Sequence, residues 1–504
     1  NDGFRTFGGS LFTTASLLPM PFDYVTDEVD VNVRYSLGAG YLALGWYLSD
    51  FDNQNTAINW ESPFTTIPGS ETLSAAQAPD NQFQQLKLGG GYRFAALNTS
   101  VNASVAMGEI EQTTPFLPYT TNDGIATAPL PRTSLDGSVD TLNYALALTS
   151  RPFAKARVRL SYRYDERDNT TPVEMYERVI VDTILSGDPE ANLPYSYERS
   201  TLQLSGDYDL FDSVRISGGY ERRDLERDLQ EVREQTEDTG WGRVRWRPND
   251  IIEIDGRAGT SRRDIDSYNE VVAVAFGQNP LLRKYNMAFR FREFAEVALS
   301  IMPPGSPLSV TLDGRFADDD YSRSQVGLVA GKETYLGADI GYAVSDVASF
   351  YVNVSTENIE SEQFGSETFG DPDWRAFNDD DYSTVGLGFR IRQIADRIDL
   401  QIDYTRADGT SSIQLDSASN SADLFPDLET TLDFVRLRLG YRHSEKLDIN
   451  ASATYQSFRA EDWSIQGVGP ATIPEVLSLG PLPYDDEQIL LGIGFQYRLG
   501  QDTL

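Results

Sequence analysis

The feature that most constrains this chain is a strict two-residue alternation of apolar and polar side chains. It is clearest at residues 156–164, 244–247, 385–392, 435–442 and 489–497, where every second side chain is apolar or aromatic. Successive side chains of a β-strand point to opposite faces, so this period gives strands with one apolar and one polar face. A helix would need a repeat of about 3.6 residues. The chain is therefore predicted to be all-β.

Segments of this kind recur about 20 times along the chain. The expected strands span 4–14, 26–37, 39–50, 81–95, 97–110, 138–151, 155–166, 195–210, 212–226, 232–247, 251–264, 285–302, 306–320, 332–345, 347–360, 378–393, 397–408, 428–443, 446–459 and 487–499. Lengths of about 10–16 residues fit tilted strands that cross a membrane and extend beyond it.

The connections between these strands alternate between short and long. Short turns are expected near 37–38, 96–97, 152–153, 211–212, 248–250, 345–346, 395–396 and 444–445, and long loops at 51–80, 111–137, 167–194, 265–284, 361–377, 409–427 and 460–486. Bacterial outer-membrane barrels combine short periplasmic turns with long extracellular loops. The sequence therefore predicts a large antiparallel transmembrane β-barrel, a single domain over residues 1–504. The last strand follows a long loop, so the C-terminus is expected in the periplasm.

A soluble β-sandwich or propeller is the alternative architecture. Neither has a reason to sort its loops by length onto opposite ends of the strands. Propeller blades of about 40–50 residues would also repeat a recognisable motif, and the sequence contains none. The barrel is the better interpretation.

The composition agrees with a barrel and excludes other classes. Only alternate residues of a barrel strand face lipid, so the negative mean hydropathy does not argue against a membrane protein. No run of about 18 apolar residues occurs, so no transmembrane helix is expected. The formal net charge of −35 makes nucleic acid an improbable partner, because phosphate binding needs a basic face. The first residues lack the basic and apolar regions of a signal peptide, so an export signal is expected to have been removed, or the chain begins inside a longer precursor.

Few residues could carry out chemistry. The chain has no Cys and one His, His443, so thiolate chemistry, covalent haem attachment and most His-based metal sites are excluded. Acidic clusters at 318–320, 379–381 and 485–486 lack the spacing of a calcium loop and are interpreted as solvated loop ends. No enzyme activity, cofactor site or metal site is predicted.

The polar face of the strands should line the lumen. It carries acids such as Asp207, Asp313, Asp339, Asp399 and Asp403, and a larger set of arginines. The arginines are Arg157, Arg159, Arg163, Arg243, Arg245, Arg247, Arg290, Arg292, Arg390, Arg392, Arg436, Arg438 and Arg442. A mixed charged wall is expected of any hydrated pore, through solvation and cross-strand pairing. It could instead be a surface for an anionic or propionate-bearing partner inside the barrel, and the sequence leaves both interpretations open.

Several strings resemble the MtrB/PioB family of outer-membrane barrels that associate with decahaem cytochromes. The resemblance begins at residues 7–10, 18–19 and 21–24. Its most specific part is 130–137 (LPRTSLDG), 148–152 (LTSRP) and 162–172 (YRYDERDNTTP), and it returns at 461–463, 472–480 and 484–485 before the closing strand.

The resemblance implies a function that the alternation alone does not. Members of the family sheathe a periplasmic multihaem c-type cytochrome, which crosses the outer membrane through the lumen and in many systems meets an extracellular multihaem cytochrome. The barrel carries no haem; the partner does. Family barrels have about 26 strands, within the range of outer-membrane barrels, so this chain is either part of a larger barrel that lacks N-terminal strands or a shorter barrel of about 20.

The alternative to the conduit function is that of a channel for solutes. A diffusion porin or substrate-specific channel would have the same barrel, and a long loop such as 51–80 could fold inward to constrict it. A haem stain of bands that co-purify with the barrel would separate these two functions.

Overall fold

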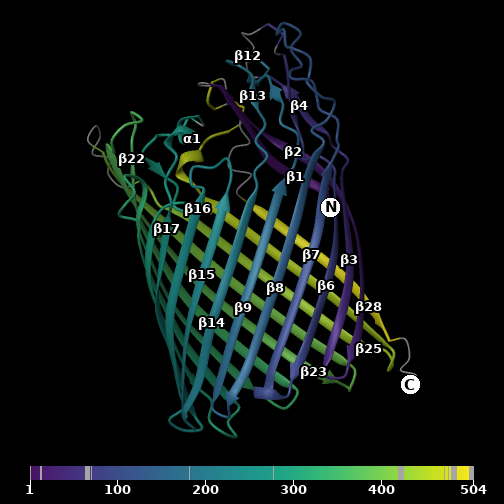
Figure 1. The fold of residues 1–504 in the computed structure, drawn as a ribbon, viewed down its shortest axis with the longest axis vertical. Helices are drawn as coiled ribbons and strands as arrows, with labels where there is room; N and C mark the ends of the chain where they lie inside the picture. The colour runs from purple at the N-terminus through teal and green to yellow at the C-terminus, as the bar shows by residue number, and fades with distance from the viewer. Residues whose placement is uncertain are drawn as a thin grey trace.

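The computed structural model describes residues 2–11, 14–62, 68–69, 71–180, 182–275, 277–417, 425–469, 472–474, 476–477 and 485–498. It is a single sheet curled into a barrel (Figure 1). In that view β8, β9 and β14 form the near wall, and β23, β25 and β28 cross behind them. The predicted all-β barrel is confirmed.

The sheet contains 22 strands, of which β18 (Leu282–Arg283) and β27 (Val476–Leu477) are two-residue parallel additions. The other 20 pair antiparallel with their neighbours in chain order, as the sequence predicts. They are β1 (Asp2–Leu11), β2 (Thr14–Leu37), β3 (Gly40–Asn53), β6 (Asn81–Phe94), β7 (Thr99–Gln112), β8 (Gly137–Phe153), β9 (Ala156–Asn169), β14 (Tyr197–Phe211), β15 (Val214–Arg227), β16 (Glu234–Trp246), β17 (Ile252–Ile265), β19 (Arg290–Ile301), β20 (Leu308–Asp320), β21 (Val326–Ala343), β22 (Ala348–Gly365), β23 (Trp374–Ile394), β24 (Ile398–Ser417), β25 (Leu428–Arg442), β26 (Leu447–Glu461) and β28 (Asp486–Tyr497).

Cross-strand register keeps the two faces separate across the sheet. Between β9 and β14, Leu160 lies opposite Leu204 on one face and Arg157 lies opposite Asp207 on the other. Large exposed hydrophobic side chains such as Leu204 mark the first face. Charged side chains of the second face surround a recess of about 250 Å³ that spans β9 to β16. A recess of this kind indicates the concave side, so the charged face lines the lumen and the apolar face is the outer surface.

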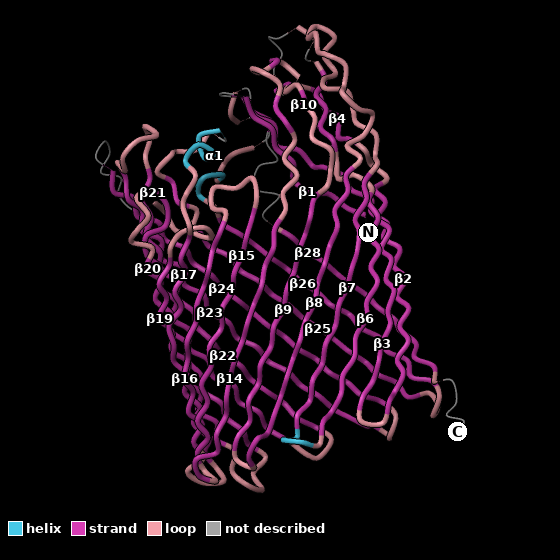
Figure 2. Tube along the Cα trace, viewed as in Figure 1, coloured by secondary structure: helices cyan, strands magenta, loops and turns pink. Residues whose placement is uncertain are grey.

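Short and long connections lie at opposite ends of the barrel, as predicted. Figure 2 shows the tight turns at one end and the extended loops at the other. The first tight turn is typical: Gly38 adopts a φ of 58°, which only glycine takes without steric cost. Some connections at the long-loop end are nevertheless short, such as residues 228–233 and 321–325.

Several predicted strand boundaries are wrong, and the two largest errors lie at the second strand and at strand 397–408. The second strand was expected at 26–37, but β2 begins at Thr14 and contains Pro19 and Pro21. A proline removes a backbone donor, so the sequence around it does not read as a strand. Strand 397–408 was expected to give way to a loop at 409, yet β24 continues to Ser417, paired with β23. Beyond the bilayer both faces of a strand meet water, so the alternation that reveals it disappears.

The last strand has one paired edge. β28 pairs with β26, and within the described part of the chain no ladder joins it to β1 or β2. Its side chains are correspondingly open on both faces, and Ile493 is 74% exposed. Membership in a barrel of more strands stays a prediction.

The long loops between β3 and β14 form a tower beyond the rim (Figure 1). It includes the hairpin of β4 (Ala57–Glu61) and β5 (Thr72–Ala76), and the small pairs β10 (Met175–Tyr176) with β13 (Glu190–Ala191) and β11 (Val179–Ile180) with β12 (Ile184–Leu185). No helix in the described ranges is long and apolar enough to cross a membrane.

One buried carboxylate joins the three loops of the tower. Asp182, 6% exposed, accepts hydrogen bonds from the Ser74 amide at 3.0 Å and the Thr121 amide at 2.9 Å. The Thr120 hydroxyl donates to the same carboxylate at 2.6 Å. Each donor comes from a different loop than Asp182 does, so the tower is a single packed unit.

The two-faced wall yields a stability prediction. Leu160→Arg, on the outer face, should lower the free energy of unfolding in a bilayer by roughly 2–4 kcal/mol, because the guanidinium would be placed in lipid. Ala147→Arg is the matched control, since Ala147 lies opposite Ser161 on the lumen face, one ladder position away. Equilibrium urea unfolding in lipid vesicles measures both. Equal losses for the two variants would contradict the assignment of the faces.

Candidate functional site

The structure places the predicted lumen arginines on the charged face. Arg157, Arg159 and Arg163 alternate with the outer side chains of β9, and the arginines of β16, β19, β23 and β25 are in register with that face. Arg247 follows β16 and pairs with Glu253 on the same face. Whether any of them touches a partner stays a prediction.

Between β14 and β20 the arginines form a lattice of ion pairs with acids of neighbouring strands. Arg243 donates two hydrogen bonds to Asp255, at 2.6 and 2.7 Å, and Arg245 donates to the same carboxylate at 2.9 Å. Two pairs that the sequence analysis did not single out extend the lattice: Arg257 with Glu296 at 3.2 Å, and Arg215 with Asp209 at 2.6 Å. Only the register, which the sequence does not give, brings these partners together.

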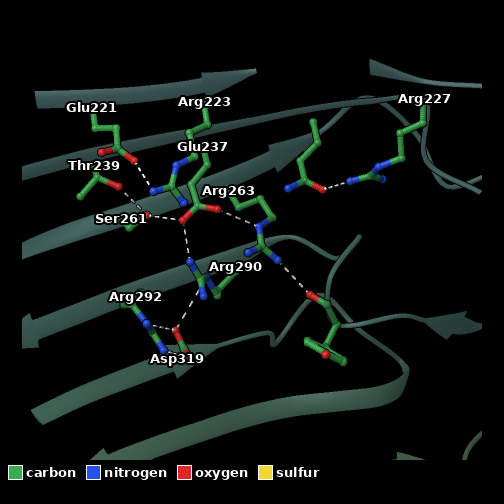
Figure 3. A network of polar contacts seen from close by, with 12 residues as sticks. Glu221, Arg223, Arg227, Glu237, Thr239, Ser261, Arg263, Arg290, Arg292 and Asp319 are labelled. Atoms are coloured by element: carbon green, nitrogen blue, oxygen red, sulfur yellow. Dashed lines mark hydrogen bonds and ion pairs between the residues drawn. The ribbon is translucent and has the colours of Figure 1, made fainter. Parts of the chain in front are cut away.

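The most buried part of the lattice surrounds Glu237 (Figure 3). Arg290 lies 2.6 Å and Arg263 3.1 Å from its two carboxylate oxygens, and the Ser261 hydroxyl donates at 2.8 Å. The side chains of Glu237, Arg263 and Arg290 are only 11–13% exposed. Asp319 continues the network, with two bonds of 2.7 Å from Arg292.

The same network holds the long loop 266–289, which carries the short helix α1 (Glu270–Ala275), against the wall. Arg263 donates to the Tyr285 carbonyl at 2.9 Å, and Lys284 pairs with the buried Glu231. Farther around the rim, the Asn279 amide donates to the Gly370 carbonyl at 3.1 Å. Burial raises the pKa of Tyr268 at the base of the loop. The loop is therefore a fixed part of the rim.

Six of the predicted arginines make no ion pair within 4.0 Å among the described residues. Two of these, Arg157 and Arg163, lie on β9. The other four are Arg390, Arg392, Arg436 and Arg438, on β23 and β25. The lumen wall thus has a self-neutralised part and a part whose positive charges lack acidic partners.

The described residues contain no group of three or more His, Cys, Asp or Glu that could hold a metal ion. Two of the acidic clusters interpreted in the sequence as solvated loop ends, 318–320 and 379–381, instead lie within β20 and β23 and have partners in the sheet. Asp319 pairs with Arg292, and the Asn358 amide donates to Asp379 and Asp381 at 2.6 and 3.0 Å. The site offers charge and hydrogen bonding over a wide surface.

The Glu237 network yields a second prediction. Glu237→Gln should lower the free energy of unfolding by roughly 3 kcal/mol, because Arg263 would be left as a buried charge without an acid and Arg290 with Asp319 alone, at 3.8 Å. Glu293→Gln is the control on β19, an exposed outer-face position, and should change stability by less than about 0.5 kcal/mol. Thermal unfolding of the purified barrel in detergent measures both. A Glu237 variant as stable as the control would show that the network is not structural.

Comparisons with known proteins agree with this architecture. The ferric enterobactin receptor PfeA from Pseudomonas aeruginosa aligns with a TM-score of 0.51 at 9% identity, over 98% of this chain and 79% of the receptor. The copper transporter OprC aligns with a TM-score of 0.51 at 10% identity, over 96% of this chain and 82% of that one. At such low identity these matches support the fold alone.

Sequence comparison is more specific. Outer membrane protein MtrB from Shewanella baltica (strain OS185) is 27% identical over 504 residues, covering 99% of this chain and 70% of that protein. The family model described as an outer membrane β-barrel porin, MtrB/PioB, matches residues 1–499. These matches confirm the resemblance seen in the sequence and place the protein in the outer membrane. With the family model matched over nearly its whole length, the chain belongs to the MtrB/PioB family.

Proposed function

We propose that this barrel sheathes and docks a multihaem c-type cytochrome, a decahaem one by family resemblance, and so forms a transmembrane conduit for extracellular electron transfer. Family membership is the observation that carries the proposal. The barrel supplies the wall and the docking surface, the cytochrome supplies the haems, and no catalytic step is assigned to this chain.

The composition and the wall support this division of labour. With no Cys and a single His, the chain cannot carry a series of haems of its own. Its antiparallel ladder pairs the backbone groups of neighbouring strands inside the bilayer, so the wall could separate a polar haem protein from lipid. Arginines on the lumen face offer forked donors to haem propionates or acidic side chains.

The alternative is a diffusion porin or substrate-specific channel. The family description itself contains the word porin, and the outer-membrane barrel fold suits both functions. The two proposals differ in what occupies the lumen: a haem protein in the first, water and small solutes in the second.

The orientation of the barrel in the outer membrane is part of the same proposal. Long loops are proposed to be extracellular, and the short turns and C-terminus periplasmic, following the arrangement of bacterial outer-membrane barrels. The tower centred on Asp182 would then stand outside the cell, as a preformed surface for an extracellular multihaem cytochrome.

A liposome assay tests the conduit. Vesicles enclose a reduced dye, with an impermeant oxidant outside. Barrel together with the co-purifying cytochrome should oxidise the dye, because only the pair places haems across the bilayer. Barrel alone and cytochrome alone should leave it reduced. Rapid dye loss with barrel alone, and no haem protein co-purifying from native membranes, would favour the porin.

Epitope tags test the direction. Tags in the loops after β9 and β17, near residues 188 and 278, should bind antibody on intact cells. Tags in the turns near Pro248 and Asp346 should bind only after the outer membrane is permeabilised. The opposite result would reverse the proposed topology while leaving the fold unchanged.

A further inference from the structure

Four of the six lumen arginines that make no ion pair among the described residues lie close together in the sheet. Arg390 and Arg392 on β23, and Arg436 and Arg438 on β25, flank β24 and form what we name the β23–β25 arginine cluster. Within the described residues none of the four makes an ion pair within 4.0 Å. Two of them contact neutral groups: Arg390 donates to the Gln401 amide oxygen at 2.8 Å, and Arg436 lies over the Phe434 ring.

The acids nearest to the cluster have hydrogen-bond or ion-pair partners outside it. Asp399 accepts the Gln393 backbone amide at 2.8 Å. Asp403 accepts the Tyr351 hydroxyl at 2.7 Å and the Gln401 amide at 2.9 Å. Asp448 on β26 pairs with Arg498 at 2.5 Å and Arg442 at 3.9 Å. Asp399 and Asp403 bring two negative charges to the four arginines, so the cluster keeps an excess of positive charge.

The cluster borders a recess that has room for a ligand group. Arg390, Arg392 and Arg438 line a hollow of about 470 Å³ that extends over β26 to β28. Its far side is formed by Gly440, Gly492 and Gly494, and a Cβ placed on Gly494 would meet no atom within 4 Å. Because glycine has no side chain, these positions leave space in the recess.

The arginines of the β14–β20 lattice use their donors differently from those of the β23–β25 cluster. There, arginines such as Arg243 and Arg292 are each held by two hydrogen bonds to one carboxylate, so their donors are used within the wall. Toward the described part of the chain, the guanidinium groups of the β23–β25 cluster use few of their donors, as in the single bond from Arg390 to Gln401. Guanidinium forks bind carboxylates in a two-pronged geometry and with charge assistance.

From these contacts we infer that the β23–β25 arginine cluster and its recess are the place on the lumen wall where carboxylate groups of the guest protein dock. This inference rests on the proposed function, because it names the anchoring point for the proposed cytochrome. The paired arginines of the β14–β20 lattice hold the wall itself together and contribute little to docking.

The test uses the barrel purified from native membranes with its guest. The variant Arg390→Gln/Arg438→Gln removes two charges from the cluster without breaking an ion pair. Arg157→Gln/Arg163→Gln is the matched control, with the same loss of charge from two lumen-face arginines that also lack ion pairs. Haem per barrel is measured after washes of rising NaCl, and thermal unfolding verifies that each barrel is folded.

The cluster variant should bind its guest roughly tenfold or more weakly and lose the salt dependence of retention, because charge-assisted hydrogen bonds are removed. The control should behave as the wild type does. Arg390→Lys/Arg438→Lys should fall between them, since it keeps the charges but not the forks.

The outcomes separate the two claims. Equal loss in the cluster and control variants, or no loss in either, would overturn the docking site while leaving the conduit in place. A folded wild-type barrel from native membranes that carries no haem protein would overturn the proposed function itself.

Discussion

The whole structure depends on the backbone hydrogen bonds of one antiparallel ladder. Inside a bilayer an unpaired backbone amide or carbonyl group costs roughly several kcal/mol. A chain of short apolar segments can therefore cross only by pairing each strand with the next. The ladder runs in chain order from β1 to β28. Once it is formed, its pleat divides every strand into an outer apolar face and an inner charged one, and the lumen chemistry follows from that division.

The inner face shows how a wide charged wall can be stable. Arginine and acid side chains on neighbouring strands stand directly or diagonally opposite, as Arg243 and Asp255 do, and neutralise one another. Where partial burial makes an unpaired charge costly, as around Glu237, each group has several partners. The β23–β25 cluster departs from this pattern, because it gathers four of the six lumen arginines that make no ion pair among the described residues, and such a gathering is a physical reason to look for a ligand there.

Sequence reasoning reached the fold because alternation and loop length are local signals. It located Leu160 on the outer face and Arg157 on the inner one from period alone. It could not tell which arginines are neutralised, because Arg290 meets Glu237 only through a register across three strands. Nor could it find the tower, since Asp182 joins loops more than 60 residues apart and no short-range pattern marks it. Beyond the bilayer, β24 kept its pairing after its alternation had ended.

Charged side chains are distributed unevenly between the two ends of the barrel. The chain carries 77 acidic and 42 basic residues, and acids outnumber arginines at one part of the long-loop rim. A large hollow there is bordered by Glu166, Asp168, Glu198 and four further acids against three arginines. Arginines of the β23–β25 cluster, such as Arg390 and Arg392, lie close to the short turns instead. In the proposed conduit, an acidic guest would be attracted at the short-turn end and repelled at this part of the rim, so the same fixed charges that admit it from one side would oppose its escape through the other.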